Sequence, residues 1–230
     1  MTLDGYCKLK DIECPYLGIE DQMRCEGFIR KPIINFPELQ GFRKIPCLSR
    51  EIIITEKLDG TSGLIYIDEN NNIFAGSRNR WLWGSVQDEI HNDNHGFAQW
   101  VKTNKEELLK LGKGFHYGEY WGKGIQRGYG LNEKRFSLFN VSRWIKDRTQ
   151  ILGEKQEYCP ECCYVVPIIA KCDMMDSEFI MRALNHLEMN GSIAAPGFKP
   201  AEGIIIYHTA GNLYFKKTIL NDEKGKDADK

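Results

Sequence analysis

The sequence has 230 residues, of which 42% are hydrophobic and 11% aromatic, so it can bury a substantial core as one large domain or one domain with a small appendage. Its 31 Lys and Arg residues against 32 Asp and Glu residues give a net charge of −1, which argues against a generally basic nucleic-acid coat and leaves room for a local basic groove. It contains no run of about 18 apolar residues and no signal-peptide pattern at its start, so we expect a cytoplasmic protein without a membrane partner, in the host cytoplasm if a phage or virus encodes it.

The first predicted elements are strands. Residues 1–40 are expected to be an N-terminal elaboration of the domain that follows. Three runs rich in β-branched and aromatic residues, at 51–57, 62–68 and 72–77, predict a strand meander. The segment DENNN between the last two has the composition of a hairpin turn.

A helix and two more strands come next. Residues 95–112 show helical spacing of apolar side chains and finish with Gly112, where a helix would stop. The extended-type runs at 114–121 and 134–141 predict strands.

The cysteine-rich segment YCPECCY resembles half of a zinc site. No second CxxC or HxxxH pair follows, and only Cys172 lies nearby. Zinc remains an alternative, but reduced and inert thiols are the favoured interpretation. The cysteines concerned are Cys159, Cys162, Cys163 and Cys172.

The last elements are a second helix at 177–190, stopped by Gly191, and strands at 202–208 and 213–217. The charged residues 221–230 are expected to form a disordered tail. Together these elements predict an α+β fold with antiparallel sheets and flanking helices.

The motif EKLDG places Lys57 directly after a β-branched run, two residues before Asp59. A surface lysine at a strand end is the better explanation of such a motif on its own. Further blocks follow in order, however, and they are SRNR (77–80), FHYGEYWG (115–122), KRFSLFNV (134–141), AEGIIIY (201–207) and LYFKKT (213–218).

This series of blocks, from about residue 43 to 218, resembles the ATP-dependent RNA ligases of the phage RNA-ligase-2 type. That family belongs to the covalent nucleotidyltransferases, together with DNA ligases and mRNA capping enzymes. The resemblance implies an ATP-grasp-like nucleotidyltransferase domain over 41–220, and RNA repair by joining a 5′-phosphate to a 3′-hydroxyl through lysine-AMP and adenylated RNA. It also implies ATP and Mg²⁺ (or Mn²⁺) as cofactors.

The same resemblance implies the nucleophile and the groups that activate it. Lys57 takes the place of the nucleophile, and Asp59 and Glu202 those of metal-binding carboxylates. A lysine attacks only as its neutral amine, whereas its ordinary pKa is about 10.4. Two carboxylates beside it would hold the proton unless they bind a divalent cation, so a metal is expected.

The nucleotide-binding roles are implied by position as well. Glu56 would read adenine, Arg78 would bind phosphate or ribose, and Glu119 would accept from the ribose hydroxyls. Phe139 would stack on adenine. Lys216 and Lys217 stand where the family has two phosphate-binding lysines. Because neighbouring strand residues point to opposite faces, only one can face the site, and Lys216 is favoured.

Two residues depart from the family's pattern. They weaken the assignment of the later reaction steps more than that of lysine adenylation. Asn140 stands where an aspartate commonly follows the stacking Phe, and Tyr207 where a lysine is frequent.

Only about a dozen residues follow Thr218, so we expect a minimal catalytic domain whose RNA-binding surface a protein partner could supply. The expected substrate is RNA, as a nicked duplex or as single-stranded ends. The alternatives are a DNA ligase, a capping-type enzyme or a non-catalytic nucleotide-binding relic.

Overall fold

The computed structural model describes residues 5–7, 28–30, 38, 41, 44–153, 155–220 and 222. Contacts divide the chain into two units, Met1–Lys44 and Ile45–Lys230. In the first unit, β1 (Gly5–Cys7) pairs antiparallel with β2 (Phe28–Arg30). Whether residues 1–40 elaborate the following domain stays a prediction. The predicted tail at 221–230 lies outside the described residues, apart from Asp222.

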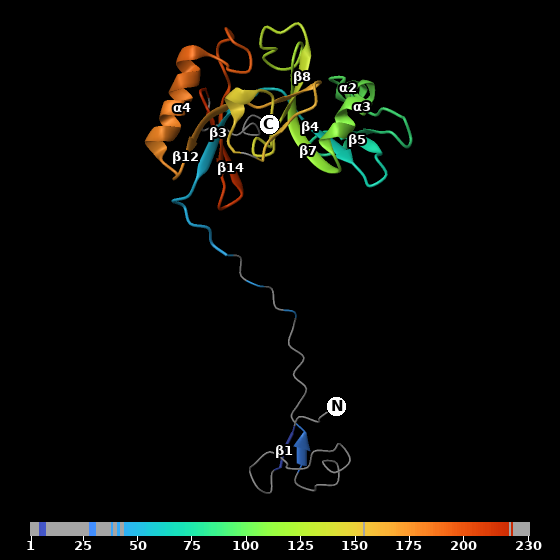
Figure 1. Ribbon diagram of the computed structural model, residues 1–230, viewed down its shortest axis with the longest axis vertical. Helices are drawn as coiled ribbons and strands as arrows, with labels where there is room; N and C mark the ends of the chain where they lie inside the picture. The colour runs from blue at the N-terminus through green and yellow to red at the C-terminus, as the bar shows by residue number, and fades with distance from the viewer. Residues whose placement is uncertain are drawn as a thin grey trace. The chain divides into compact units, whose positions relative to one another are not determined.

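Two sheets form the framework of the second unit (Figure 1). The six-stranded sheet has, in spatial order, β11 (Cys163–Val165), β8 (Lys134–Leu138), β7 (Gly114–Gly122), β4 (Thr61–Ile67), β5 (Ile73–Gly76) and β6 (Trp81–Gly84). The four-stranded sheet has β12 (Ile168–Cys172), β3 (Ile52–Lys57), β13 (Gly203–His208) and β14 (Leu213–Thr218). The remaining elements are β9 (Trp144–Ile145), β10 (Glu157–Tyr158), α2 (Phe97–Thr103), α3 (Lys105–Leu108), η1 (Leu109–Leu111), η2 (Arg148–Gln150) and α4 (Ser177–Asn190).

The predicted α+β class is confirmed. Most strand pairs are antiparallel, but β11 pairs parallel with β8, and β10 with β9. β6 was not predicted as a strand, and β8 ends three residues earlier than expected. Within the residues that the structure describes, no helix is long and apolar enough to cross a membrane.

The predicted three-strand meander is wrong. β4 and β5 form the expected hairpin, but β3 pairs with β12 and β13 in the other sheet. Composition identifies strands without naming their partners, which here lie more than a hundred residues further along the chain. The short segment after Lys57 therefore carries the chain from one sheet to the other.

The first predicted helix is interrupted. α2 ends at Thr103, and the chain resumes as α3 and η1 before stopping at Gly112, which has a φ of 77°. The break lies at Asn104, whose backbone leaves helical geometry with a φ of −100° and a ψ of 16°, and whose side-chain amide donates to the carbonyl of Trp100.

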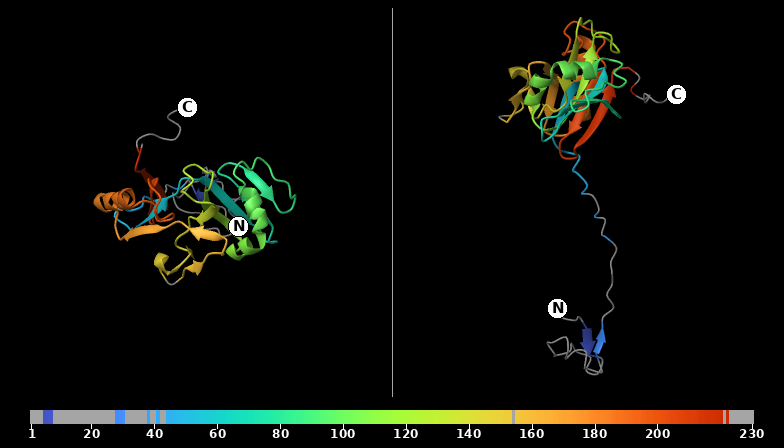
Figure 2. Two further views of the ribbon diagram at one scale, coloured as in Figure 1. Left: turned by 90° about the horizontal axis from the view of Figure 1, so that it is seen from above. Right: turned by 90° about the vertical axis from the view of Figure 1, so that its right-hand side faces the viewer.

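One hydrophobic core lies under α4, and a larger core contains residues of both sheets, including Ile53 of β3. α4 covers one face of the four-stranded sheet (Figures 1 and 2), where Leu184 and Leu187 pack with Ile52, Ile54 and Ile204. α2 and α3 cover one face of the six-stranded sheet, where their apolar residues pack with those of β4, β5 and β8. Lys57 lies at the end of β3, where the chain leaves the four-stranded sheet.

Candidate active site

The candidate nucleophile lies at the end of β3, where the connection between the two sheets begins. Lys57 ends β3, and its Nζ lies 2.6 Å from Oε2 of Glu202, the residue just before β13. The Lys57 side chain is 17% exposed and that of Glu202 only 6%. A buried carboxylate is tolerated when a cation pairs with it. The two sequence-predicted residues are thus brought together by the pairing of Lys57 with Gly203 in adjacent strands.

Asp59 forms a second ion pair, with a residue that the sequence did not reveal. Its Oδ2 accepts from Nε of Arg127 at 2.9 Å, and Arg127 also donates to the carbonyl of Pro200. The backbone N–H of Asp59 donates to the hydroxyl of Tyr129. Burial raises the pKa of Tyr129, which keeps this hydroxyl neutral at physiological pH. Arg127 and Tyr129 therefore fix the segment that follows Lys57.

Glu119 holds the last residue of the motif. Its Oε1 accepts from the backbone N–H of Gly60 at 3.1 Å. Gly60 packs so closely on β7 that a Cβ would lie 2.5 Å from the carbonyl oxygen of Tyr120 and 2.8 Å from Cβ of Trp121. Only glycine fits this approach. Four of the predicted site residues therefore belong to the segment Lys57–Gly60 or contact it, namely Lys57, Asp59, Glu119 and Glu202.

This close approach predicts a strong effect of Gly60→Ala. We expect the substitution to lower the free energy of unfolding by about 1–3 kcal/mol, since the added methyl group must push β7 away from the connection. Denaturation in urea measures the effect. Gly153→Ala is the control, because nothing lies within 4 Å of its added Cβ. Equal stability of both variants would contradict the close packing.

The Glu56 side chain contacts the loop that follows α4. Its Oε2 accepts from the backbone N–H groups of Ile193 and Ala194, both at 2.9 Å, in the loop after α4. By strand alternation it points to the α4 face, whereas Lys57 points to the other. These contacts anchor the loop after α4 to β3, and the adenine-reading role of Glu56 stays a prediction.

The burial of Glu56 also predicts that the free energy of unfolding depends on pH. It is 1% exposed, and burial raises its pKa. The folded protein then binds this proton more tightly than the unfolded chain, so the stabilisation present in acid is lost as the pH rises through the folded-state pKa.

We expect Glu56→Gln to gain stability relative to the wild type as the pH rises from below the ordinary value of 4.5 to neutral. Urea denaturation across that range gives the difference in free energy of unfolding. Glu161→Gln, at an exposed position, is the matched control. A difference that stays flat for Glu56→Gln would show that its carboxyl keeps an ordinary pKa.

The strand register bears on the two adjacent lysines. Lys216 pairs with Ile205 and thereby shares a face with Lys57, while Lys217 pairs with Ile204 on the α4 side. Lys216 is exposed, and Nζ of Lys217 forms an ion pair with Asp222 at 2.8 Å. This placement supports the choice of Lys216.

Arg78 and Phe139 lie further along the six-stranded sheet. Arg78 is exposed in the turn between β5 and β6. Phe139 follows β8, is 39% exposed, and its N–H donates to the carbonyl of Tyr117. Since Glu119 pairs with Ser137, Phe139 and Glu119 share one face of the sheet. Their contacts with a nucleotide stay predictions.

Several backbone N–H groups in the loop at 190–203 already donate to partners within the protein. The N–H groups of Ile193 and Ala194 donate to Glu56, and that of Ala195 donates to the hydroxyl of Ser192. The N–H of Ser192 donates to the carbonyl of Phe198, and the N–H of Phe198 donates to the carbonyl of Ala195. These donors are used internally.

The cysteine cluster gives no support to zinc. Cys159 is buried, its Sγ donates to the carbonyl of Cys163, and both thiols are free. Among the described residues, no group of three or more His, Cys, Asp or Glu side chains is arranged so that it could hold a metal ion.

Comparisons with known proteins agree with this fold. A sequence model of the RNA ligase family matches residues 50–220. No curated protein matches the chain.

Among solved structures, a Naegleria gruberi RNA ligase variant with ATP and Mn is 20% identical, with a TM-score of 0.53 over 78% of this chain and 53% of that one. Another variant with ATP and Mn is 22% identical, with a TM-score of 0.51 over 74% of this chain and 50% of that one. The chain spans about half the length of the structures it matches, and at these identities the likeness shows the fold.

Proposed function

The chain belongs to the RNA ligase family, and we propose that it is an ATP-dependent RNA ligase that joins a 5′-phosphate to a 3′-hydroxyl through lysine-AMP and adenylated RNA. The observation that carries the proposal is the 2.6 Å contact between Nζ of Lys57 and Oε2 of Glu202. It lies in a connection whose other groups, Asp59 and Gly60, are held by Arg127 and Glu119. Such fixed geometry suits a reacting lysine.

In the first step, Nζ of Lys57 attacks the α-phosphorus of ATP. A P–N bond forms, the bond between the α-phosphorus and the oxygen that bridges to the β-phosphate breaks, and pyrophosphate leaves. Nζ must lose its proton first, and Oε2 of Glu202 is the acceptor within reach. The RNA 5′-phosphate then displaces Lys57 from AMP, and finally the 3′-hydroxyl attacks this phosphate and releases AMP.

ATP and Mg²⁺ or Mn²⁺ fit the residues present. The Naegleria variants of similar fold are described with ATP and Mn. Asp59 and Glu202 are hard oxygen donors, and Mg²⁺ is commonly held by one or two carboxylates together with substrate phosphates. When bound, the metal supplies charge neutralisation at the phosphates.

Other side chains would hold the nucleotide. Glu119 and Phe139 share one sheet face, and we assign them to the ribose and adenine. Lys216, on the Lys57 face of β14, would bind phosphate, and Arg78 would bind phosphate or ribose. Cations here balance charge that develops during phosphoryl transfer.

The family match favours RNA ligation over DNA ligation or capping. A non-catalytic relic is disfavoured because Lys57, Asp59, Glu119 and Glu202 are all present and three hydrogen bonds fix their arrangement. A protein partner that supplies part of the RNA-binding surface remains part of the proposal.

Label transfer from α-labelled nucleotides tests this function. We expect ATP with Mg²⁺ to label the protein strongly and GTP to label it weakly, because a pocket that hydrogen-bonds one base edge rejects another. Omission of the metal should abolish labelling. Equal labelling by GTP would point to a capping-type enzyme, and no labelling by either would point to a relic.

A further inference from the structure

Five aromatic side chains line one face of the six-stranded sheet. Tyr66 of β4 pairs directly with Phe115 of β7 on one side and with Phe74 of β5 on the other. Tyr117 follows two residues after Phe115, and Trp81 of β6 completes the set. We call these five residues the aromatic row. The opposite face of the sheet is the one buried under α2 and α3.

The rings of the aromatic row touch one another and still face solvent. The centroids of Tyr66 and Phe115 are 4.4 Å apart in a stacked arrangement, and Phe115 and Tyr117 are nearly parallel at 14°. Trp81 packs on both Phe74 and Tyr66. Even so, Trp81, Phe115 and Tyr117 remain 50%, 54% and 55% exposed. Large rings clustered in this way on a surface usually mark a binding site.

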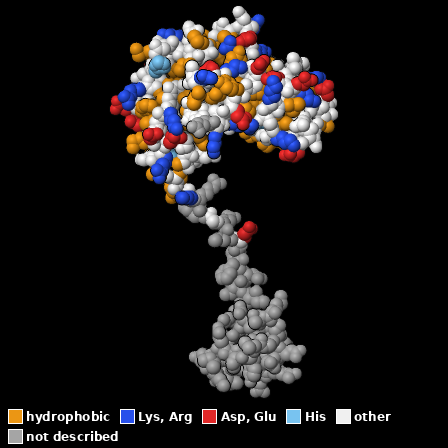
Figure 3. Space-filling model, viewed as in Figure 1, with side chains coloured by type: hydrophobic (Ala, Val, Ile, Leu, Met, Phe, Trp, Pro, Cys, Tyr) orange, Lys and Arg blue, Asp and Glu red, His pale blue; other side chains and the backbone are white. Residues whose placement is uncertain are grey.

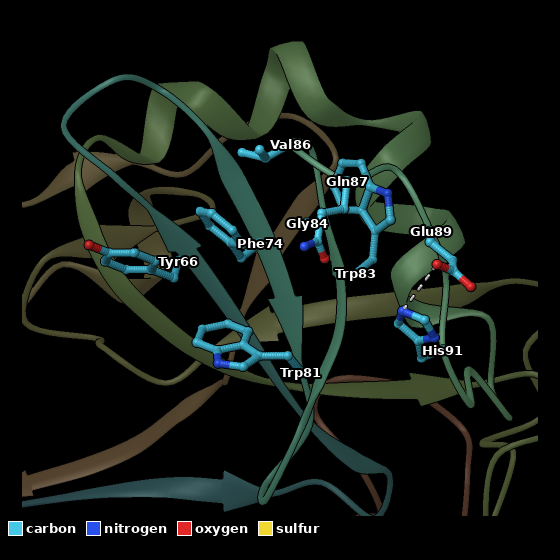
Figure 4. Close-up of a pocket in the computed structure, with 9 residues that line it drawn as sticks. All are labelled: Tyr66, Phe74, Trp81, Trp83, Gly84, Val86, Gln87, Glu89 and His91. Carbon is cyan, nitrogen blue, oxygen red and sulfur yellow. Dashed lines mark ion pairs between the residues drawn. The ribbon is translucent and has the colours of Figure 1, made fainter.

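A pocket lies at the Trp81 end of the aromatic row (Figure 4). The rings of Tyr66, Phe74 and Trp81 form one side, and Trp83 and Gln87 lie across from them. Glu89, which forms an ion pair with His91, also lines it. Flat apolar walls with an amide and a carboxylate suit a planar heterocycle that carries hydrogen-bond donors and acceptors.

The aromatic row is continuous with the proposed nucleotide site. Tyr117 and Glu119 are two residues apart on the same face of β7, and the N–H of Phe139 donates to the carbonyl of Tyr117. Glu119 lies four positions after Phe115, a length of roughly 13 Å along a strand. The row therefore leads from the place assigned to AMP toward the edge strand β6.

Charge alone would bind a polyanion weakly here. Figure 3 shows acidic and basic side chains interspersed over one face of the second unit. The exposed Arg78 and Arg80 precede Trp81 in the turn between β5 and β6, and Arg80 also donates to the carbonyl of Asn92. Two local cations beside stacked rings are typical of surfaces that hold single strands.

From these observations we infer that the aromatic row binds an unpaired stretch of the RNA strand next to the reacting end, by stacking its bases on Tyr117, Phe115 and Trp81 and placing one base in the pocket. The inference rests on the proposed function for the choice of RNA. It selects single-stranded ends over a fully paired duplex, because bases stack on side chains only when their faces are free.

Fluorescence anisotropy with a labelled single-stranded RNA of about ten nucleotides tests the inference, a length within the usual range of such sites. We expect Phe115→Ala and Trp81→Ala each to weaken binding at least about 5-fold, the lower end for losing one base-stacking ring. Trp81→Phe should retain most of the affinity. Tyr158→Ala, at an aromatic residue 61% exposed on β10, is the matched control and should bind normally.

Self-adenylation with ATP, measured without RNA, separates this inference from the proposed function. The aromatic-row variants should label as the wild type does. RNA binding that ignores Phe115→Ala and Trp81→Ala, while labelling proceeds, would overturn the inference alone. No labelling of the wild type, with binding that responds to the substitutions, would overturn the proposed function alone.

Two other results would also overturn the inference. One is equally tight binding of a blunt duplex of the same sequence. The other is an oligomer in gel filtration that Phe115→Ala converts to a monomer, since the row would then be an interface between copies of the chain.

Discussion

Lys57→Arg should abolish formation of the AMP adduct. The guanidinium keeps the positive charge that Glu202 requires, but arginine is not deprotonated in proteins and cannot attack phosphorus. This substitution is preferred to Lys57→Ala, which would remove the positive charge that lies 2.6 Å from the Glu202 carboxylate, 6% exposed. Intact-mass measurement after incubation with ATP and Mg²⁺ detects the adduct.

The same variant should still seal RNA that is already adenylated, because Lys57 takes no part as a nucleophile once AMP is on the RNA. Lys171→Arg is the matched control. Its lysine also lies in the four-stranded sheet and pairs with a glutamate, Glu51, at 2.7 Å. An adduct that persists in Lys57→Arg would place the nucleophile elsewhere. Sealing that is lost together with adenylation would show that the substitution disturbs the whole site.

Glu202→Gln should slow adenylation by at least about 100-fold while the protein stays folded. The amide keeps the shape of the side chain but neither binds a metal nor accepts a proton as a carboxylate does. Quenched-flow labelling with α-labelled ATP gives the rate, and thermal denaturation reports the fold.

Glu51→Gln is the control for this rate, since it removes the carboxylate of the Lys171 pair instead. It should adenylate as the wild type does. A normal rate in Glu202→Gln would remove Glu202 from the chemistry. Unfolding of this variant would make the glutamate a structural residue and would remove the support for its metal role.

The parts of the site that follow local sequence were predictable. The β-branched run before Lys57 indicates a buried strand, and an acid beside the apolar run at 204–206 indicates a partner for a cation. Two such strands with functional residues at their ends are visible in the sequence, although their pairing is not. That is why Lys57 and Glu202 were identified separately, and their 2.6 Å contact appears only in the fold.

The residues that sequence reasoning missed act across long separations. Arg127 reaches Asp59 from a loop whose course depends on left-handed backbone at Gly124, Gly128 and Tyr129. No spacing rule predicts where such a loop directs its side chains. The contact of Glu56 with the loop after α4 was missed for the same reason, because Ile193 lies 137 residues further along the chain.

The most direct test of the central claim is to map the AMP group on the wild-type protein. After incubation with ATP and Mg²⁺, we expect one added AMP per chain, and peptide mass spectrometry should place it on the peptide that contains Lys57. The bond should be cleaved by acid and by hydroxylamine, as expected of a P–N linkage. Absence of the adduct, or its location on any other residue, would contradict the account.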